Sequence, residues 1–283
     1  MRSEPAPAST PIVSEADIAA FRDDGVVCLR GVLSPEWTER MQAPVANAMC
    51  APETVDMTTM ATALDDSHAT GKGRFFAGTD HWLRDDEFLA FGTETPLAQV
   101  AAELLGSAKI WLYEDSILVK EAGSSERTSF HQDLGYFHVD GEQVATIWCP
   151  LDPVTTENGA LGFVRGSHLW GKDFKPNLFV SDTPIPHTEG ADLPDVDAAP
   201  GDYEIISFDM EPGDITVHQG RTLHGSPPNL SESVARRVIS MRFCGDDTRY
   251  RRKPGVPQKE HHTVADGASL DASEGLPLAF PVR

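Results

Sequence analysis

From Lys109 onward the chain consists of short segments in which apolar and polar residues alternate, and this pattern constrains the fold most strongly. The segments are IWLYEDSILVK, QVATIWCPL, ALGFVRGS, YEIISFDM, DITVHQG and RRVISMRF, separated by turn clusters such as ENG, EPGD and SPPN. A period of two is typical of strands, and Gly, Pro, Asn and Asp clusters at this spacing join antiparallel strands. We therefore expect a mainly β fold, a sandwich or a barrel.

The residues before this β region predict helices and one buried strand. GVVCLRGVL is the predicted strand. The span from Cys50 to Gly78 is polar and has no clear period, so it predicts a long loop or lid. Helices are predicted, from their N-cap, proline and glycine signals, for SEADIAAFRDDG after Ser14, for SPEWTERMQAPVANAM after Ser34, and for TPLAQVAAELLG up to Gly106.

Charge and composition narrow the possible partners. The chain has 23 basic and 44 acidic residues, a net charge of −21, and this disfavours nucleic acid and anionic membranes because both bind positive surfaces. No apolar run reaches the length of about 18 residues that a transmembrane helix needs, and the N-terminus lacks the apolar core of a signal peptide. The four cysteines form no CxxC pair and lie mostly in apolar runs, so we expect reduced thiols and a cytoplasmic location.

The stretch SFHQDLGYF contains two candidate metal ligands. His131 and Asp133 are two residues apart, and side chains at i and i+2 of an extended chain point to the same face. Both can therefore reach a single cation. An HxD pair taken alone is a weak signal, because the same pair on a protein surface would simply be solvated.

A second cluster follows in GDITVHQGRTLHGSPPNLSESVARRVISMRF. His224 opens a turn rich in Ser, Pro and Asn, and the next predicted strand carries Arg236 and Arg237. A guanidinium within an alternating apolar strand is costly to bury without a partner. A dicarboxylate ligand, held by the arginine fork, would supply that partner.

Two histidines and one carboxylate on one face of a metal form the facial triad of non-haem Fe(II) oxygenases, which leaves positions open for further ligands. A cupin-type metal-dependent hydrolase or isomerase could use the same residue types, although it would not explain the arginine downstream of His224. A jelly roll that binds a ligand without turnover is the non-catalytic alternative.

In order and spacing, these features resemble the phytanoyl-CoA dioxygenase family of Fe(II)/2-oxoglutarate-dependent oxygenases. The resemblance covers roughly residues 15–250 and is carried by LVKEAGSSERTSFHQD, VATIWCPLDPVTTENGALGFVRGSH, MEPGDITVHQGRTLHGSPPNLSE and ARRVISMRF. It implies a double-stranded β-helix, a cupin-like jelly roll, with supporting N-terminal helices. We expect a disordered tail over 1–13 and a single dioxygenase domain over 14–283, with its jelly-roll core at about 109–245.

The resemblance implies that His131, Asp133 and His224 hold Fe(II). The family's reaction uses O₂ to decarboxylate 2-oxoglutarate to succinate and CO₂ and to hydroxylate a C–H bond of the substrate. Related halogenases have a small residue in place of the carboxylate ligand. Asp133 therefore favours hydroxylation, or a related desaturation or ring closure, over halogenation.

The resemblance also implies a binding site for 2-oxoglutarate. Ser226 and Arg236 match the residues that hold its 5-carboxylate, and Trp148 is expected close to it. Arg237 is the alternative to Arg236, because the turn after His224 is one residue longer than is usual in the family.

Residues that contact the substrate, which we expect to be a small-molecule metabolite, are less constrained. Aromatic side chains after the metal-binding strand, together with Trp111 and Tyr113, are expected to form an apolar wall, although ordinary core packing explains Trp111 at least as well. A solvated loop residue is the simpler account of Arg74. The sequence makes no prediction of the oligomeric state. The candidate substrate contacts are Arg74, Phe75, Trp82, Tyr136 and Phe137.

Overall fold

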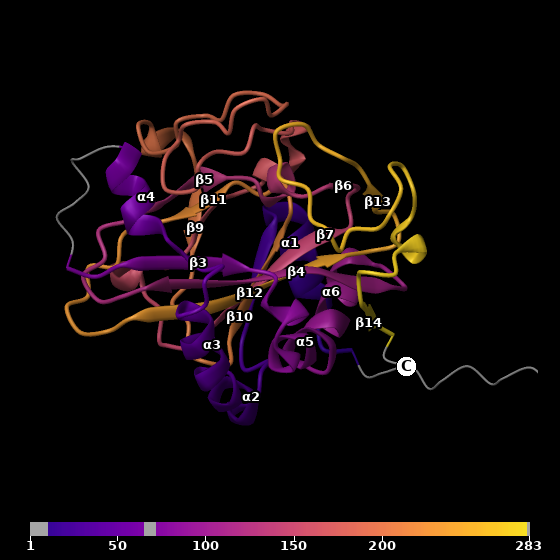
Figure 1. The fold of residues 1–283 in the computed structure, drawn as a ribbon, viewed down its shortest axis with the longest axis horizontal. Helices are drawn as coiled ribbons and strands as arrows, with labels where there is room; N and C mark the ends of the chain where they lie inside the picture. Colours follow the sequence, from indigo (N-terminus) through magenta and orange to yellow (C-terminus); the bar gives the residue numbers. More distant parts are fainter. Residues whose placement is uncertain (1–10, 65–71, 282–283) are drawn as a thin grey trace, which may run out of the picture.

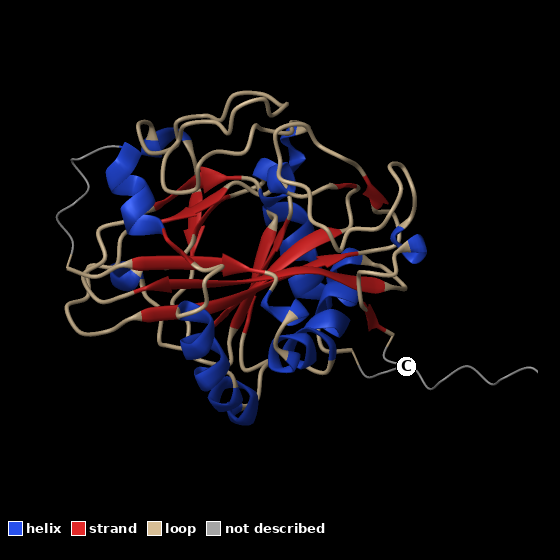
Figure 2. Ribbon diagram, in the orientation of Figure 1, coloured by secondary structure: helices blue, strands red, loops and turns tan. Residues whose placement is uncertain are grey.

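The structure is a computed structural model that describes residues 11–64 and 72–281. Its strands form two main antiparallel sheets, and helices cover one face of the larger sheet (Figures 1 and 2). The predicted mainly β class is confirmed. In this view the smaller sheet lies above the larger one, and the segment after β12 passes along the right side of the molecule.

The larger sheet has the strand order β1-β10-β7-β12-β4-β3-β2, with β14 paired to β4. The smaller sheet has the order β5-β11-β8-β9, and β13 pairs with β6. The strands are β1 (Val26–Leu29), β2 (Val55–Asp56), β3 (Phe75–Thr79), β4 (Ile110–Lys120), β5 (Thr128–His131), β6 (Val139–Asp140), β7 (Val144–Pro150), β8 (Gly162–Val164), β9 (Ile205–Ser207), β10 (Ile215–Gln219), β11 (His224–Ser226), β12 (Arg236–Cys244), β13 (Arg249–Tyr250) and β14 (Leu278–Phe280).

The helices precede most of these strands in the chain. They are α1 (Glu15–Asp24), α2 (Pro35–Arg40), α3 (Gln42–Met49), α4 (Met57–Leu64), α5 (Asp86–Thr93) and α6 (Leu97–Leu105). Two of the predicted helices are confirmed with their end signals. Ser14 forms a capping box with Asp17 at the start of α1, and both Gly25 and Gly106 adopt the left-handed conformation that ends a helix.

Strict alternation along the central strands separates a structural face from a chemical face. On β7, Ile147 and Cys149 pack into the core that the helices cover, while Thr146 and Trp148 point between the sheets. On β12, Ile239 and Met241 likewise face the helices. Because successive side chains of a strand point to opposite faces, every second residue is available to line a cavity. Arg236, Ser240 and Arg242 of β12 occupy such positions.

Two local predictions are wrong. The predicted helix after Ser34 divides into α2 and α3 at Met41, whose ψ of −5° departs from the helical value although its backbone N–H still bonds to Trp37. An uninterrupted helix would need an N–H at position 44 to bond the Arg40 carbonyl, and Pro44 has none. The predicted loop or lid over Cys50–Gly78 contains α4 and β3. β3 pairs with β4 along its whole length, and this pairing stabilises the strand although the segment lacks a clear period. Residues 65–71 of that span lie outside the described residues.

The ends of the chain also contact this framework. Residues 1–10 of the predicted tail lie outside the described residues, but Ile12 and Val13 donate their backbone N–H groups to the Glu103 carboxylate of α6.

None of the described helices has the length and apolar character needed to cross a membrane.

Candidate active site

Strand pairing brings the three predicted metal ligands together. His131 ends β5 and His224 begins β11, and the two residues are direct partners in the antiparallel register. Gln132 keeps an extended backbone, so Asp133, the first residue of the following 3₁₀ turn, presents its carboxylate to the same point. The Asp133 Oδ1 atom lies 3.6 Å from His131 Nε2 and 3.8 Å from His224 Nε2. All three side chains are buried, and their candidate ligand atoms lie within 4.8 Å of one another.

Hydrogen bonds orient both histidines toward this point. The Nδ1 atoms of His131 and His224 lie 2.8 Å and 2.9 Å from the carbonyl oxygens of Ser129 and Thr222. A carbonyl can only accept, so Nδ1 carries the proton and Nε2 presents a lone pair. Burial lowers the pKa of His224 well below its usual value, which keeps the ring neutral, as a metal ligand must be.

Asp133 is held as a carboxylate by two further residues. Its Oδ2 accepts hydrogen bonds from Thr146 Oγ1 at 2.5 Å and from His218 Nε2 at 3.2 Å, which leaves Oδ1 facing the two histidines. Burial alone would raise the pKa of Asp133, but the surrounding histidines and Arg242 hold it well below its usual value. Two neutral imidazoles and an ionised carboxylate are a donor set that fits a divalent non-haem iron.

The predicted cosubstrate residues lie beside this centre. Arg236 and Trp148 are each 1% exposed, and the guanidinium lies 5.5 Å from the indole ring. Arg236 Nη1 donates to the Gly159 carbonyl at 2.9 Å, but its Nε and Nη2 atoms and Trp148 Nε1 are buried without a hydrogen-bond partner in the described structure. Such donors are costly unless a ligand accepts from them, so the arrangement fits a carboxylate.

Arg236 and Arg237 have different surroundings. Arg237 makes a bidentate ion pair with Asp152, with Nε–Oδ2 and Nη2–Oδ1 distances of 2.9 Å and 2.5 Å. Arg236 faces the space between the sheets together with Ser226. Of the two candidates, Arg236 is the one that lines a space together with the triad.

Two connected spaces adjoin the triad. A narrow cavity of about 20 Å³ lies between the triad, Trp148, Ser226 and Arg236. A wider pocket of about 340 Å³ shares the wall residues His131, Asp133, Leu118, Phe179 and Arg242 with it. Most of the wider pocket's surface is apolar, and its polar lining includes Arg242, Glu114 and Ser116.

Only some of the predicted substrate contacts line the wider pocket. Tyr136 and Phe137 do. Phe75 is fully buried against Met57 and Ala61 of α4. The remaining two also lie elsewhere: Trp82 packs its ring edge-on against His261, and the exposed Arg74 side chain pairs with Glu121.

Several residues at the site were missed by the sequence reasoning. Thr146 and His218 hold Asp133, Arg242 lines both spaces, and Lys120 contacts Ser226. Arg242 and Lys120 carried a usable signal, because each is a cation in an alternating apolar strand, the argument that identified Arg236. Thr146 had no such signal, since a threonine is ordinary in a strand.

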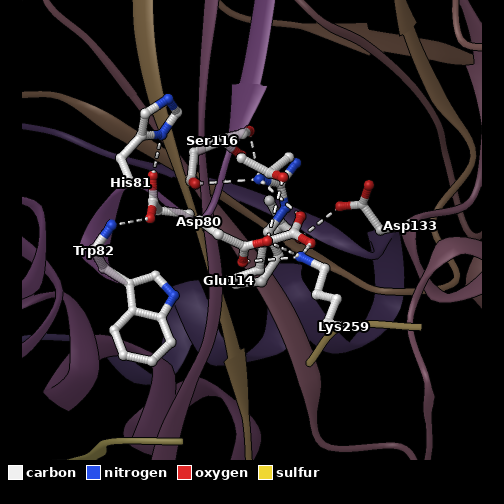
Figure 3. A network of polar contacts seen from close by, with 12 residues as sticks. Asp80, His81, Trp82, Glu114, Ser116, Asp133 and Lys259 are labelled. Atoms are coloured by element: carbon white, nitrogen blue, oxygen red, sulfur yellow. Dashed lines mark hydrogen bonds and ion pairs between the residues drawn. The ribbon is translucent and has the colours of Figure 1, made fainter. Parts of the chain in front are cut away.

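The polar wall of the wider pocket continues into a network of charged residues (Figure 3). Arg242 Nη1 donates to Ser116 Oγ at 2.5 Å and lies 3.5 Å from Glu114 Oε1. Lys259, from the segment after β13, forms ion pairs with both Glu114 and Asp80. We call Asp80, Glu114, Ser116, Arg242 and Lys259 the rim network.

Comparison with known proteins gives a consistent result. The family model "Phytanoyl-CoA dioxygenase (PhyH)" matches residues 21–238. The multifunctional dioxygenase prhA of Penicillium brasilianum is 24% identical over 240 residues, which cover 82% of this chain and 73% of that protein. The 1-deoxypentalenic acid 11-beta-hydroxylase of Streptomyces arenae is 27% identical over 285 residues, or 94% and 92% of the two chains.

Solved structures confirm the predicted jelly-roll fold. The non-heme alpha ketoglutarate dependent epimerase SnoN from nogalamycin biosynthesis superposes with a TM-score of 0.69 at 23% identity, over 94% of this chain and 98% of that one. EctD from S. alaskensis, solved with 2-oxoglutarate and 5-hydroxyectoine, gives 0.62 at 18% identity, over 91% and 84%. Since the family model matches most of the sequence, the chain belongs to the phytanoyl-CoA dioxygenase family, whose members are Fe(II)- and 2-oxoglutarate-dependent oxygenases.

Proposed function

We propose that the protein hydroxylates a C–H bond of a small-molecule metabolite. In this reaction substrate, 2-oxoglutarate and O₂ give the hydroxylated product, succinate and CO₂. The observation that carries the proposal is the convergence of the triad His131, Asp133 and His224 with the unpartnered donors of Arg236 in one buried site. A hydrolase needs the triad but has no use for a dicarboxylate clamp.

His131, Asp133 and His224 would hold the metal, and Thr146 and His218 would keep the carboxylate oriented. Fe(II), when bound, supplies the activation of O₂ and the oxidising power for C–H cleavage. The protein keeps the His224 imidazole neutral and the Asp133 carboxylate ionised, and it encloses the site in buried side chains that exclude water. Asp133 is present where a halogenase would have a small residue, which supports hydroxylation.

Arg236, Ser226 and Trp148 would bind the 5-carboxylate of 2-oxoglutarate, with Arg237 kept out by its pairing to Asp152. The narrow cavity has room for about one water molecule in this structure, so its wall must move to admit the cosubstrate. Phe179 is the side chain we expect to move. It lines both spaces and has a backbone φ of 67°, a left-handed conformation that is unusual for a bulky residue.

The wider pocket supports a compact and largely apolar substrate. Its volume of about 340 Å³ is at the lower end of small-molecule sites. Val55, Met57, Leu118 and Phe137 provide apolar contact, and Arg242 can donate a hydrogen bond to one polar group of the substrate. The hydroxylase relative from Streptomyces arenae is named for a carboxylic acid substrate, and this supports testing acids of similar size first.

Two further parts of the proposal concern the whole chain. We propose that residues 14–283 act as one domain, which is supported by the ion pairs of Lys259 with Asp80, which precedes the jelly-roll core, and with Glu114 of β4 within it. We also propose a cytoplasmic location, which is supported by the absence of disulfides among the four free cysteines.

The proposal is tested by following 2-oxoglutarate. Protein loaded anaerobically with Fe(II) should convert 2-oxoglutarate to succinate once O₂ is admitted, and a true substrate should accelerate this and gain one oxygen atom per succinate formed. Asp133→Ala should lose metal binding by at least about 100-fold and lose succinate formation, whereas Asp271→Ala, which removes an exposed carboxylate, should behave as wild type. Native succinate formation by Asp133→Ala would contradict the metal assignment.

A further inference from the structure

Two buried cations face each other beside the cosubstrate cavity. Lys120 and Arg236 are direct partners in the antiparallel register of β4 and β12. Lys120 is 0% exposed and Arg236 is 1% exposed, and neither forms an ion pair within the described residues. Like charges directly opposite on paired strands are destabilising, and burial makes the repulsion stronger. This repulsion makes the pair unfavourable for stability alone, so we expect a role of the two cations in ligand binding.

Lys120 forms hydrogen bonds to the Ser226 hydroxyl and to the backbone carbonyl groups next to it. Lys120 Nζ donates to Ser226 Oγ at 2.8 Å and to the carbonyl oxygens of Pro227 at 2.8 Å and Ser226 at 3.5 Å. Arg236 Nη1 donates to the same Ser226 Oγ at 3.5 Å. A serine hydroxyl has two acceptor lone pairs and one hydrogen. With both lone pairs engaged by cations, the hydrogen is left to point to another acceptor.

We propose that Lys120 is a positioning residue for 2-oxoglutarate. By donating to Ser226 Oγ, Lys120 makes the hydroxyl a hydrogen-bond donor to the distal carboxylate, beside the guanidinium of Arg236. Lys120 itself does not line the cavity, whereas Ser226 and Arg236 do, so it acts through Ser226. This inference rests on the proposed function, because it assigns a role in binding that cosubstrate.

The charge on Lys120 supports the same conclusion. Burial and the nearby Arg236 lower the pKa of Lys120 well below its usual value, and attraction from Glu126 offsets only part of this. A carboxylate bound at Arg236 and Ser226 brings negative charge next to the lysine and favours its ammonium form. Ligand binding thus offsets the repulsion between the two cations. The arrangement is unfavourable in the ligand-free protein and becomes favourable when the carboxylate is bound.

The test is the affinity for 2-oxoglutarate, measured by calorimetry on the full chain loaded with Zn²⁺ in place of iron, so that no turnover is needed. Lys120→Met should weaken 2-oxoglutarate binding by at least about tenfold, because a hydrogen bond to a charged group is lost or misdirected. It should leave the affinity for 2-oxobutyrate, which lacks the distal carboxylate, within about twofold. Lys109→Met, the same substitution at the exposed N-terminal end of the β4 region, should change neither affinity.

A double-mutant cycle tests whether the effect passes through Ser226. In a Ser226→Ala background, Lys120→Met should weaken 2-oxoglutarate binding by less than about threefold, since the hydroxyl is already gone. An equal effect in both backgrounds would overturn the role of Lys120 as an orienting group. Equal weakening of 2-oxobutyrate, or native 2-oxoglutarate affinity in Lys120→Met, would overturn the proposal altogether. If the wild-type protein with Zn²⁺ fails to bind 2-oxoglutarate, it is the proposed function that fails.

Discussion

The two clusters of buried and partly buried charge beside the triad differ in how their charges are matched. In the rim network, Lys259 lies between the carboxylates of Asp80 and Glu114 (Figure 3). Arg242 lies 3.5 Å from Glu114 Oε1. The second cluster consists of Lys120 and Arg236, which face each other on β4 and β12 and form no ion pair within the described residues. Removing one partner of a matched ion-pair network destabilises a fold, whereas unmatched buried cations beside a cavity are typical of a ligand site. Whether the charges in a cluster are balanced therefore distinguishes polar residues that maintain the fold from those that bind a ligand.

The largest expected effect follows from replacing Arg236. Arg236→Met should weaken 2-oxoglutarate binding by roughly 1,000-fold, because two charge-assisted hydrogen bonds are lost. The same variant should leave the ligand-free protein equally stable or more stable by about 1–4 kcal/mol, because an unmatched buried charge is removed. Calorimetry with Zn²⁺-loaded protein and urea unfolding of the ligand-free protein measure the two effects. If Arg236→Met were destabilised and kept native affinity for 2-oxoglutarate, Arg236 would be a structural residue and not part of the binding site.

A substitution in the rim network should lower the stability of the protein and leave its affinity for 2-oxoglutarate unchanged. Lys259→Met leaves Asp80 and Glu114 without their shared cation, and burial and repulsion from Glu114 already raise the pKa of Asp80. We expect the free energy of unfolding to fall by about 3 kcal/mol, with 2-oxoglutarate affinity unchanged. Urea unfolding and calorimetry measure both. Unchanged stability together with weakened cosubstrate binding would show that the rim network belongs to the binding site.

A smaller effect comes from a buried histidine that lies outside both clusters. Both ring nitrogens of His262 are buried without a hydrogen-bond partner in the described structure, and its ring packs against Tyr113 and Tyr250. Burial, with repulsion from His261 and Lys259, lowers its pKa to about 3. The unfolded chain titrates near 6.5, so it binds the proton between pH 6.5 and 3 and the folded chain does not.

The stability contributed by neutral His262 is therefore present above pH 6.5 and is lost as pH falls toward 3. Between pH 7 and pH 5 the loss amounts to about 2 kcal/mol. His262→Phe should remove that part of the acid slope, as measured by urea unfolding at a series of pH values, while His187→Phe, in a loop outside this cluster, should keep it. An unchanged slope in His262→Phe would show that the ring has a partner when protonated.

Much of the fold could be predicted because its signals are local. The alternating segments after Lys109 correspond to the central strands, and the caps at Ser14 and Gly25 correspond to the ends of α1. β3 was missed because pairing with β4 stabilises a segment whose own pattern is weak. The break at Met41 was missed although Pro44, which cannot donate to the Arg40 carbonyl in an uninterrupted helix, was a local signal for it.

The active site shows the same division. The HxD pair and His224 were identifiable because metal ligation demands particular residue types, and the resemblance gave their order. Thr146 and His218 were not, since their role depends on which strand lies next to Asp133. The proposed preference for Arg236 over Arg237 also depended on structure, because the two neighbours differ only in the face of β12 to which they point.

From the sequence alone one could determine the β architecture, the family resemblance and the residue types able to hold a metal and a dicarboxylate, because periodicity and ligand chemistry are properties of short stretches. The tertiary structure decided which of these side chains share a cavity and which buried charges are matched. Charge matching across strands depends on register, and register brings together residues such as Lys120 and Arg236 that are far apart in the chain.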